Sequence, residues 1–424
     1  MRKLNWILLL SLVICSIISC KQKREEITLS MWHNYGGEMQ KSMDSLIEEF
    51  NTSVGNDKGI TINVTAISSS KELNKALLSI AQEEPGAPSM PDITTAYPQN
   101  AIIFKKSGKL ANLYNYLDQS TIDKYVSPFL KEGEIDKGLY VFPLAKSSEV
   151  LYLNQTLFDE FCSATGFNNS DLATFEGLLE IATSYYKWCG KSFFTADSFF
   201  NLTLVGMEQL GEPLIVNEHL NTESKNYQYI LKLLYDAIKN KGVTLYDGYS
   251  SDLSKTGDIA ASTGSSAGIL FYGNTITYPD NRVEEVEYSI LPYPIFKAGN
   301  KIAMQRGGGL MVSASTKERE EASLTFIKWL TEPKQNLKFI TSTGYLPVTI
   351  DAYKEEMASH IQKIEDERIK KMLVTVTGMQ EEYTFFSPQI FENFDSLSKA
   401  FKTNFKKAMQ ANSFNEALAI MGSL

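Results

Sequence analysis

The chain has 424 residues, of which 43% are hydrophobic and 21% charged, a composition typical of a globular protein with room for two domains. Its net charge of −9 argues against a nucleic-acid partner, because such partners require a basic surface. The histidines are scattered, and neither H-E-x-x-H nor GxxxxGK[ST] occurs, so no metal and no cofactor are expected. Two acidic residues that meet only in the fold would leave no motif, and a glycosidase pair therefore stays open.

The N-terminus predicts an export signal. Arg2 and Lys3 precede an apolar run, Trp6–Ile18, that is too short to span a bilayer. The end of this run and the two residues after it, Ile17-Ile18-Ser19-Cys20, resemble the lipobox of bacterial lipoproteins. That resemblance implies a signal peptide at 1–19, a lipid on Cys20, a tether at 20–26, and an extracytoplasmic protein anchored to the bacterial membrane. An ordinary signal peptide with an incidental cysteine is the alternative.

Strands and helices alternate after this signal. Apolar alternation predicts a strand at Ile27–Trp32, and helical spacing predicts a helix at Glu38–Phe50 after the turn His33–Gly37. The following expected elements are a strand at Ile60–Ile67, a helix at Lys71–Gln82, a strand at Pro91–Thr95 and a turn at Tyr97–Asn100. This order with short connections predicts a largely parallel α/β sheet.

The middle of the chain begins with an unusually apolar, extended run at Leu139–Leu153. The elements expected after it are a helix at Asn226–Lys239, a small-residue loop at Ser262–Ser266, strands at Tyr288–Pro292 and within Ile302–Ser313, and helices at Lys317–Trp329, Glu332–Ser342, Tyr353–Met372 and from Asn393 onward. Cys162 and Cys189 are the cysteines of this folded part, and their spacing leaves both a disulfide and two free thiols open.

Short motifs stand in a characteristic order along nearly the whole chain. They are Leu29-Ser30-Met31-Trp32-His33, Pro91-Asp92-Ile93, Gly138-Leu139-Tyr140-Val141-Phe142-Pro143, Gly257-Asp258-Ile259-Ala260-Ala261, Gly307-Gly308-Gly309 and Gly344-Tyr345-Leu346-Pro347. Each motif is weak alone. Together, their order and spacing resemble the bacterial extracellular solute-binding proteins of the maltose-binding and glycerol-3-phosphate-binding type, which deliver ligands to ATP-driven importers.

The resemblance implies an α/β fold of the two-lobe periplasmic-binding-protein type, with a central ligand cleft and hinge crossings between the lobes. The first lobe is expected to comprise 27–143 and 304–344, and the second 144–303 and 345–424. A ligand that contacts both lobes favours the closed state, which a permease then recognises. The implied protein is a monomer that performs no chemistry, with a carbohydrate as ligand and the permease subunits of an ABC transporter as partners.

The same resemblance suggests where the ligand binds. The candidate residues are His33, Asn34, Ser70, Tyr97, Gln99, Asn100, Ser147, Ser148, Ser265, Ser266, Gly307, Gly308, Tyr345, Phe391 and Phe394. Their chemistry suits a sugar, because hydroxyl and amide groups both donate and accept hydrogen bonds and aromatic rings cover apolar sugar faces. Each residue also has an ordinary structural alternative as a turn, cap or core residue.

Departures from the glycerol-3-phosphate pattern favour a neutral ligand. Ser70 stands where that pattern has a tyrosine, Pro98 where it has a glutamate, and Phe391 close to the place of an arginine. Without that arginine the obvious bidentate phosphate partner is missing, so a sugar or polyol ranks above glycerol-3-phosphate and glycerophosphodiesters. Arg306 either reaches an anionic ligand or pairs with a surface acid. A carbohydrate-active enzyme and a surface adhesin that reuse the fold are the rival hypotheses.

Overall fold

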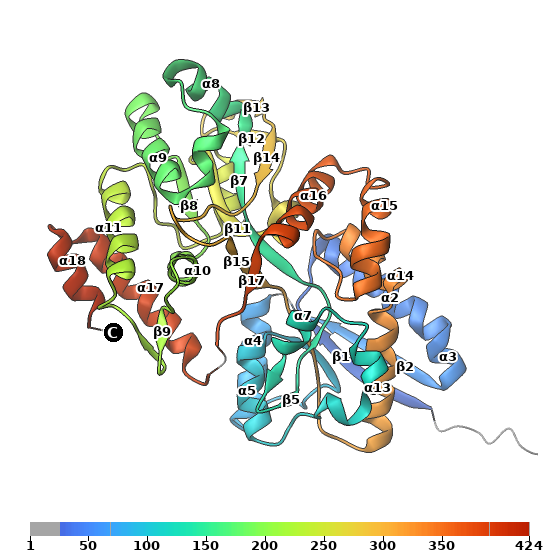
Figure 1. The fold of residues 1–424 in the computed structure, drawn as a ribbon. Coiled ribbons are helices and arrows are strands. Elements are labelled where there is room, and N and C mark those ends of the chain that lie inside the picture. Colours follow the sequence, from blue (N-terminus) through green and yellow to red (C-terminus); the bar gives the residue numbers. More distant parts are fainter. Residues whose placement is uncertain (1–25, 68, 390, 424) are drawn as a thin grey trace, which may run out of the picture.

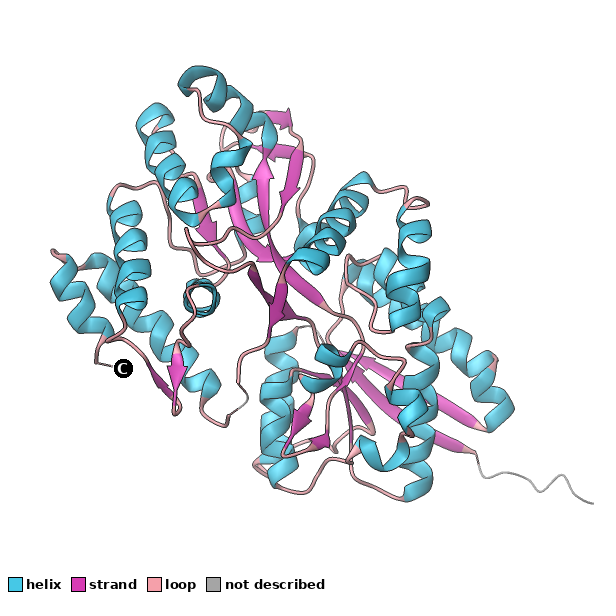
Figure 2. Ribbon diagram, viewed as in Figure 1, coloured by secondary structure: helices cyan, strands magenta, loops and turns pink. Residues whose placement is uncertain are grey.

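Two mixed sheets organise the computed structural model, which describes residues 26–67, 69–389 and 391–423 (Figures 1 and 2). The expected signal peptide and Cys20 lie outside the described residues, as does the side chain of Ser70. Each sheet is flanked by helices, and the two resulting lobes meet along crossing segments of the chain. The expected two-lobe α/β architecture is therefore confirmed.

The first sheet contains the N-terminal strands. Its order is β2 (Ile60–Ala66), β1 (Ile27–His33), β3 (Ile93–Ala96), β16 (Gly309–Val312) and β6 (Phe142–Pro143). The first three strands are parallel, as the sequence predicted, whereas β16 runs antiparallel to both of its neighbours. In β1, Leu29, Met31 and His33 are buried in alternation, because successive side chains of a strand point to opposite faces.

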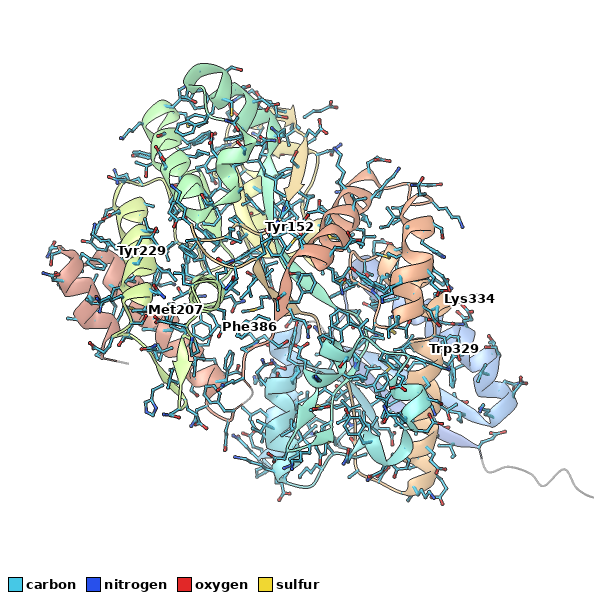
Figure 3. All side chains as sticks on the ribbon, viewed as in Figure 1. Tyr152, Met207, Tyr229, Trp329, Lys334 and Phe386 are labelled. Atoms are coloured by element: carbon cyan, nitrogen blue, oxygen red, sulfur yellow. The ribbon has the colours of Figure 1, made fainter. Side chains whose placement is uncertain are left out.

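The second sheet is built around a fully buried strand. Its order is β17 (Thr384–Phe386), β15 (Ile302–Arg306), β7 (Ser147–Asn154), β11 (Ala261–Ser265) and β8 (Phe194–Ala196), and β14 (Tyr288–Leu291) also pairs with β7. Every residue of β7 is buried, which explains the apolar run in the sequence. Tyr152 marks this strand in the second lobe, whereas Trp329 marks a helix of the first (Figure 3).

Helices cover both sheets. Those that follow the strands of the first sheet are α2 (Gly37–Thr52), α3 (Val54–Lys58), α4 (Ser70–Ala81), α5 (Pro98–Lys106), α6 (Gln119–Ile122), α7 (Ser127–Lys131), α13 (Lys317–Leu330) and α14 (Pro333–Thr341), with the 3-10 turn η1 (Leu113–Tyr116) and the hairpin β4 (Glu134–Ile135) and β5 (Gly138–Leu139). Met43, Leu46 and Phe50 form the buried face of α2, at the helical spacing the sequence predicted.

The second lobe carries the remaining elements. They are α8 (Gln155–Thr165), η2 (Asn169–Ala173), α9 (Phe175–Cys189), α10 (Phe199–Gln209), β9 (Ile215–Val216), β10 (His219–Leu220), α11 (Lys225–Lys239), α12 (Ser250–Lys255), η3 (Ser266–Phe271), β12 (Thr275–Thr277), β13 (Val283–Glu285), α16 (Glu367–Glu382), α17 (Phe394–Gln410) and α18 (Phe414–Met421). Among the described residues, no helix is long and apolar enough to cross a membrane.

The chain passes between the two sheets at neighbouring places. One crossing joins β6 to β7, and another joins β15 to β16 through Gly307 and Gly308. The segment that contains Leu346 lies beside these crossings, because its backbone forms an antiparallel bridge with Lys146 of the first crossing. Gly307 has φ +98°, and a Cβ there would lie 2.3 Å from the Ala145 carbonyl oxygen, so the close approach of two crossings requires glycine.

A buried polar cluster lies beside these crossings. Lys146 Nζ lies 2.7 Å from Glu132 Oε2, and the Gln305 side chain donates a hydrogen bond to the same oxygen. Glu132 directly follows α7 in the first lobe, whereas Gln305 belongs to β15 of the second sheet. The cluster therefore ties a first-lobe helix to two of the crossings.

Three expected elements differ from the structure. The segment 97–100 is not a turn, because α5 begins at Pro98, a residue favoured at the first helical position. Of the expected loop 262–266, residues 262–265 belong to strand β11 and Ser266 begins η3. The helix expected at Tyr353–Met372 is interrupted: the π-turn η4 (Ala352–Glu356), α15 (Met357–Ile361) and α16 replace it.

The expected lobe boundaries stay a prediction. The backbone after Leu346 continues along the first lobe, where Val126 N donates to Val348 O and Ile350 N donates to Lys124 O. Beyond α15, helix α16 packs on β14 and η3 of the second lobe.

Cys162 and Cys189 are both free thiols, the second of the two states that the sequence left open.

Candidate ligand-binding site

A narrow pocket lies at the carboxyl ends of β1 and β3, where ligands of open α/β sheets characteristically bind. Its lining comprises Asn34, Tyr35, Leu73, Asn74, Thr95, Ala96, Tyr97, Gly308 and Tyr345. Thr95 Oγ1 donates a 2.9 Å hydrogen bond to Asn34 Oδ1, which fixes the orientation of that amide. The pocket thus unites four predicted residues, Asn34, Tyr97, Gly308 and Tyr345.

Tyrosine rings form one wall of this pocket. Tyr345 stacks on Phe339 with 6.2 Å between ring centroids, and Tyr35 meets the edge of the same phenylalanine at 5.2 Å. Burial raises the pKa of both tyrosines above the usual value, so their hydroxyl groups stay protonated and available as donors. Tyr97 is 40% exposed.

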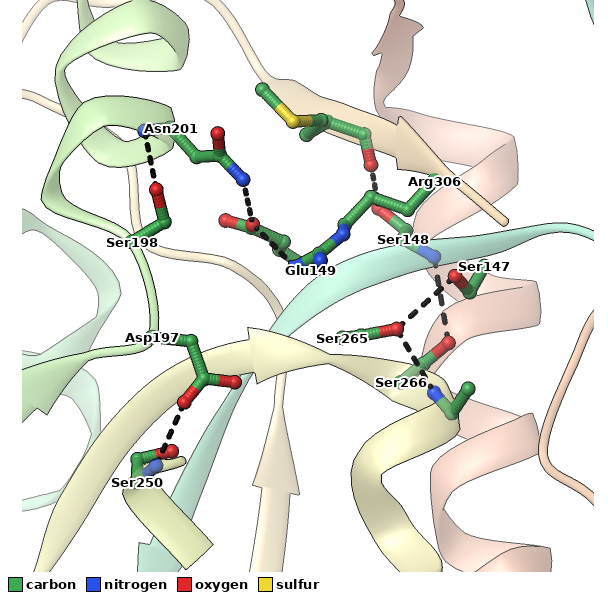
Figure 4. Close-up of polar contacts among 12 residues, drawn as sticks. Ser147, Ser148, Glu149, Asp197, Ser198, Asn201, Ser250, Ser265, Ser266 and Arg306 are labelled. Carbon is green, nitrogen blue, oxygen red and sulfur yellow. Dashed lines mark hydrogen bonds and ion pairs between the residues drawn. The ribbon is translucent and has the colours of Figure 1, made fainter. Parts of the chain in front are cut away.

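An acid-centred cluster lies on the second sheet and the elements beside it (Figure 4). Glu149 Oε1 accepts hydrogen bonds from Arg306 Nη1 at 3.0 Å and from Asn201 Nδ2 at 3.1 Å. The Glu149 side chain is only 4% exposed, whereas that of Arg306 is 33% exposed. Arg306 therefore pairs with an acid, as one of the two hypotheses held, but the acid is buried and not on the surface.

Arg306 interacts electrostatically with groups of both lobes, the tyrosine pocket of the first and the Glu149 cluster of the second. Burial raises the pKa of Glu149, although Arg306 and Asn201 oppose that shift. Burial alone would lower the pKa of Arg306, but the carboxylates of Glu149 and Asp197 and the Tyr97 phenol raise it overall. The guanidinium thus lies within electrostatic range of Tyr97 on the first lobe and of both acids on the second.

Four predicted serines meet where β7 and β11 pair. Ser265 Oγ donates to Ser147 Oγ at 3.1 Å, and the N–H of Ser148 donates to Ser266 Oγ at 3.4 Å. Ser148 Oγ also donates to the Met304 carbonyl at 3.0 Å. Ser147, Ser148 and Ser266 are buried, so Ser265 is the most accessible hydroxyl of this group.

The segment Gly264-Ser265-Ser266-Ala267-Gly268 matches the G-x-S-x-G pattern of serine hydrolases. Its central Ser266 is fully buried, and its hydroxyl accepts the Ser148 N–H. An exposed nucleophile beside a histidine is what that chemistry requires, and the bonds described for Ser266 include no histidine. The match is therefore structural.

Other predicted residues are not among those that line the pocket. His33 is fully buried, and its Nδ1 accepts the Tyr35 N–H at 3.2 Å, which shapes the turn behind the pocket. Gln99 and Asn100 lie in the first turn of α5. Phe391 packs against Phe394 with 5.5 Å between ring centroids, and Phe394 packs in turn against a phenylalanine of α10. The roles of all these residues as ligand contacts stay predictions.

Sequence reasoning missed six polar residues of the two faces, which are Tyr35, Asn74, Thr95, Glu149, Asp197 and Asn201. Glu149 carried a usable signal, since it is a charged residue in the fully buried stretch 147–154. Asp197 directly follows β8 but is separated from Arg306 by more than a hundred positions, so only the fold brings them together.

A larger depression of about 680 Å³ lies elsewhere between α5, α7 and the segment 385–389. Several of its charged groups are already paired, including Lys105 with Asp136 and Glu132 with Lys146. No group of three or more histidine, cysteine or acidic side chains suited to a metal ion occurs in the described part of the chain. The tyrosine pocket and the Glu149 cluster are therefore the better candidate site.

Residues 45–365 match the family model for the bacterial extracellular solute-binding proteins. The chain belongs to this family. Solute-binding proteins of this kind are non-enzymatic receptors of ABC transporters. They act in the periplasm or outside the cell. The expectation that this chain is not an enzyme is therefore confirmed by the family.

Relatives of this solute-binding protein have different ligands. The multiple sugar-binding protein of Streptococcus mutans serotype c is 20% identical over 361 residues, which cover 83% of this chain and 82% of that protein. The cyclic alpha-maltosyl-1,6-maltose binding protein from Arthrobacter globiformis superposes with a TM-score of 0.73 at 18% identity and covers 94% of this chain and 98% of that one. UgpB from Mycobacterium tuberculosis, in complex with glycerophosphocholine, gives 0.75 at 16% identity, with 94% and 96% covered. At these identities the structures establish the fold alone.

Proposed function

We propose that this solute-binding protein captures a sugar or polyol between its lobes and delivers it to the permease of an ABC importer. The observation that carries the proposal is the first-lobe pocket, whose polar groups are uncharged hydroxyls and amides and whose wall consists of tyrosine rings. Such groups match the hydroxyls and the C–H faces of a carbohydrate. The sugar-binding relatives support the same ligand class.

A thermal-shift and calorimetry screen of the secreted protein tests the proposal. Mono- and oligosaccharides, polyols, glycerol-3-phosphate and glycerophosphodiesters are compared at equal concentrations. A ligand that binds only the folded state raises the melting temperature by mass action. A sugar or polyol is expected to give the largest shift, and a shift with phosphate esters alone would overturn the proposal.

A glycerophosphodiester is the second candidate. The exposed part of Arg306 and the structural likeness to a protein solved with glycerophosphocholine favour it. Because Glu149 already pairs with Arg306, we rank it below a neutral carbohydrate. The same screen separates the two candidates.

We further propose that the protein is a monomer held at the membrane by a lipid on Cys20. The supporting observation is the lipobox-like sequence that ends at this cysteine. Intact-mass analysis of protein extracted from membranes should find the mature chain beginning at Cys20 with added acyl chains. The variant Cys20→Ala should lose that mass and leave the membrane fraction, and an unchanged distribution would contradict the anchor. Light scattering of the released protein should give the mass of one chain.

A further inference from the structure

Glu149 is the charged residue of strand β7, and it lies at the centre of the second-lobe face (Figure 4). One carboxylate oxygen accepts both the Arg306 and the Asn201 hydrogen bonds. A buried acid with these two donors is held in one orientation, so its charge has a fixed position beneath the guanidinium.

Arg306 keeps hydrogen-bonding capacity after this pairing. A guanidinium has five N–H donors, and Glu149 takes the one recorded at Nη1. The side chain is 33% exposed and lies in electrostatic contact with Tyr97 across the site. Arg306 can therefore donate to a ligand, while the carboxylate beneath it cancels its charge.

Asp197 adds a second negative charge to the same face. Its carboxylate is near enough to Glu149 and Arg306 to affect the pKa of both. Asp197 Oδ1 accepts the Ser250 N–H at 2.8 Å, which holds the side chain in place at the start of α10. By formal charge, the side chains of Glu149, Asp197 and Arg306 together carry −1. A phosphate ester placed here would meet net repulsion, whereas a neutral hydroxyl would meet a donor without an opposing charge.

We propose that Glu149 is a specificity-determining residue of the site, which balances Arg306 and thereby selects uncharged polyhydroxylated ligands over phosphate esters. The proposal rests on the proposed function for where the ligand binds, but not for which ligand it is. Its distinctive consequence is that removing carboxylate charge, without changing shape, should convert the site into an anion receptor.

A graded charge series tests this inference by calorimetry with glycerol-3-phosphate, glycerol and inorganic phosphate as probes. Glu149→Gln should raise the affinity for glycerol-3-phosphate by at least about tenfold, and adding Asp197→Asn should raise it further. The double variant Glu149→Gln/Arg306→Gln, which removes both partners, should lose the gain. Increasing salt should weaken the gained affinity but leave glycerol binding unchanged.

The outcomes are separable from those of the ligand screen. Wild-type protein that binds glycerol-3-phosphate as tightly as Glu149→Gln does would overturn the inference, whichever sugar binds. If wild-type protein binds no carbohydrate at all, the proposed function fails, yet the charge series still decides the role of Glu149. Should Glu149→Gln not fold, Asp197→Asn alone changes an exposed carboxylate and is expected to give a smaller gain in the same direction. No gain in either variant would sink the inference.

Discussion

Lys146 Nζ lies 2.7 Å from Glu132 Oε2, and this ion pair joins the first crossing to the first lobe. The two side chains are only 2% and 8% exposed, so both charges have lost most of their water. A buried ion pair adds little stability compared with a well-packed apolar pair. Removing one partner, however, leaves the other charge buried without compensation. The pair therefore makes the hinge region sensitive to single substitutions.

Lys146→Met should lower the free energy of unfolding by about 3–5 kcal/mol, because it leaves the Glu132 carboxylate buried and unpaired. Urea denaturation followed by circular dichroism measures this loss. The surface pair Lys232–Asp236 is the matched control, since both side chains are 48% exposed and Lys232→Met should cost less than about 1 kcal/mol. Equal losses in the two variants would contradict the role assigned to burial.

Gly307→Ala should destabilise the crossing by at least about 1–3 kcal/mol, since the residue has φ +98° and the added methyl group would meet the Ala145 carbonyl. Gly378→Ala is the control, because that glycine lies within α16 and a Cβ added to it would have no atom within 4 Å. Alanine there should be neutral or stabilising by up to about 1 kcal/mol. A fall in melting temperature is therefore expected for Gly307→Ala alone, and equal falls in both variants would contradict the role of the crossing.

His33 should make the protein less stable in mild acid. Burial lowers its pKa in the folded state below the ordinary 6.5, although Asp44 partly opposes this shift. The unfolded chain therefore binds more protons as the pH falls through 6.5, and stability declines in that range. His33→Asn should flatten this decline in melting temperature, whereas substitution of the exposed His219 should leave it unchanged. Parallel pH profiles for wild type and His33→Asn would refute the assignment.

Tyr97→Ala should weaken the binding of the sugar or polyol found in the screen by about tenfold, through loss of an aromatic face. Since Tyr97 is 40% exposed, the free energy of unfolding should change by less than about 1 kcal/mol. Tyr229 on α11 is 41% exposed and lies outside both faces of the site (Figure 3). Tyr229→Ala should leave calorimetric affinity unchanged, and equal losses would place the ligand elsewhere.

Local patterns in the sequence predicted the regular elements of the fold well. Alternation located β1, and helical spacing located α2, because each buries one face against the same core. Strand β11 escaped prediction because its small residues have low strand propensity. A Cβ added to Gly264 of that strand would lie 2.6 Å from the Asp197 carboxylate. The absence of a side chain at this position therefore makes room for a residue that is distant in the sequence.

The sequence predicted those residues of the candidate site that lie in or directly after a recognisable motif. Asn34, Tyr97 and Tyr345 follow recognisable motifs, and the structure gathers them around one pocket. Glu149 and Asp197 were missed because their importance depends on Arg306, which reaches them only through the pairing of β15 with β7. Electrostatic partners across a sheet leave no periodic trace in a single sequence.

Gln305 and Arg306 are neighbours on β15, and consecutive strand side chains point to opposite faces. One bonds the Glu132 carboxylate beside the hinge, and the other bonds the Glu149 carboxylate in the candidate site. One peptide unit therefore separates the residue that bonds the candidate site from the residue that bonds the ion pair at the crossings. Strand β15 therefore bonds one acid in each lobe, Glu132 in the first and Glu149 in the second.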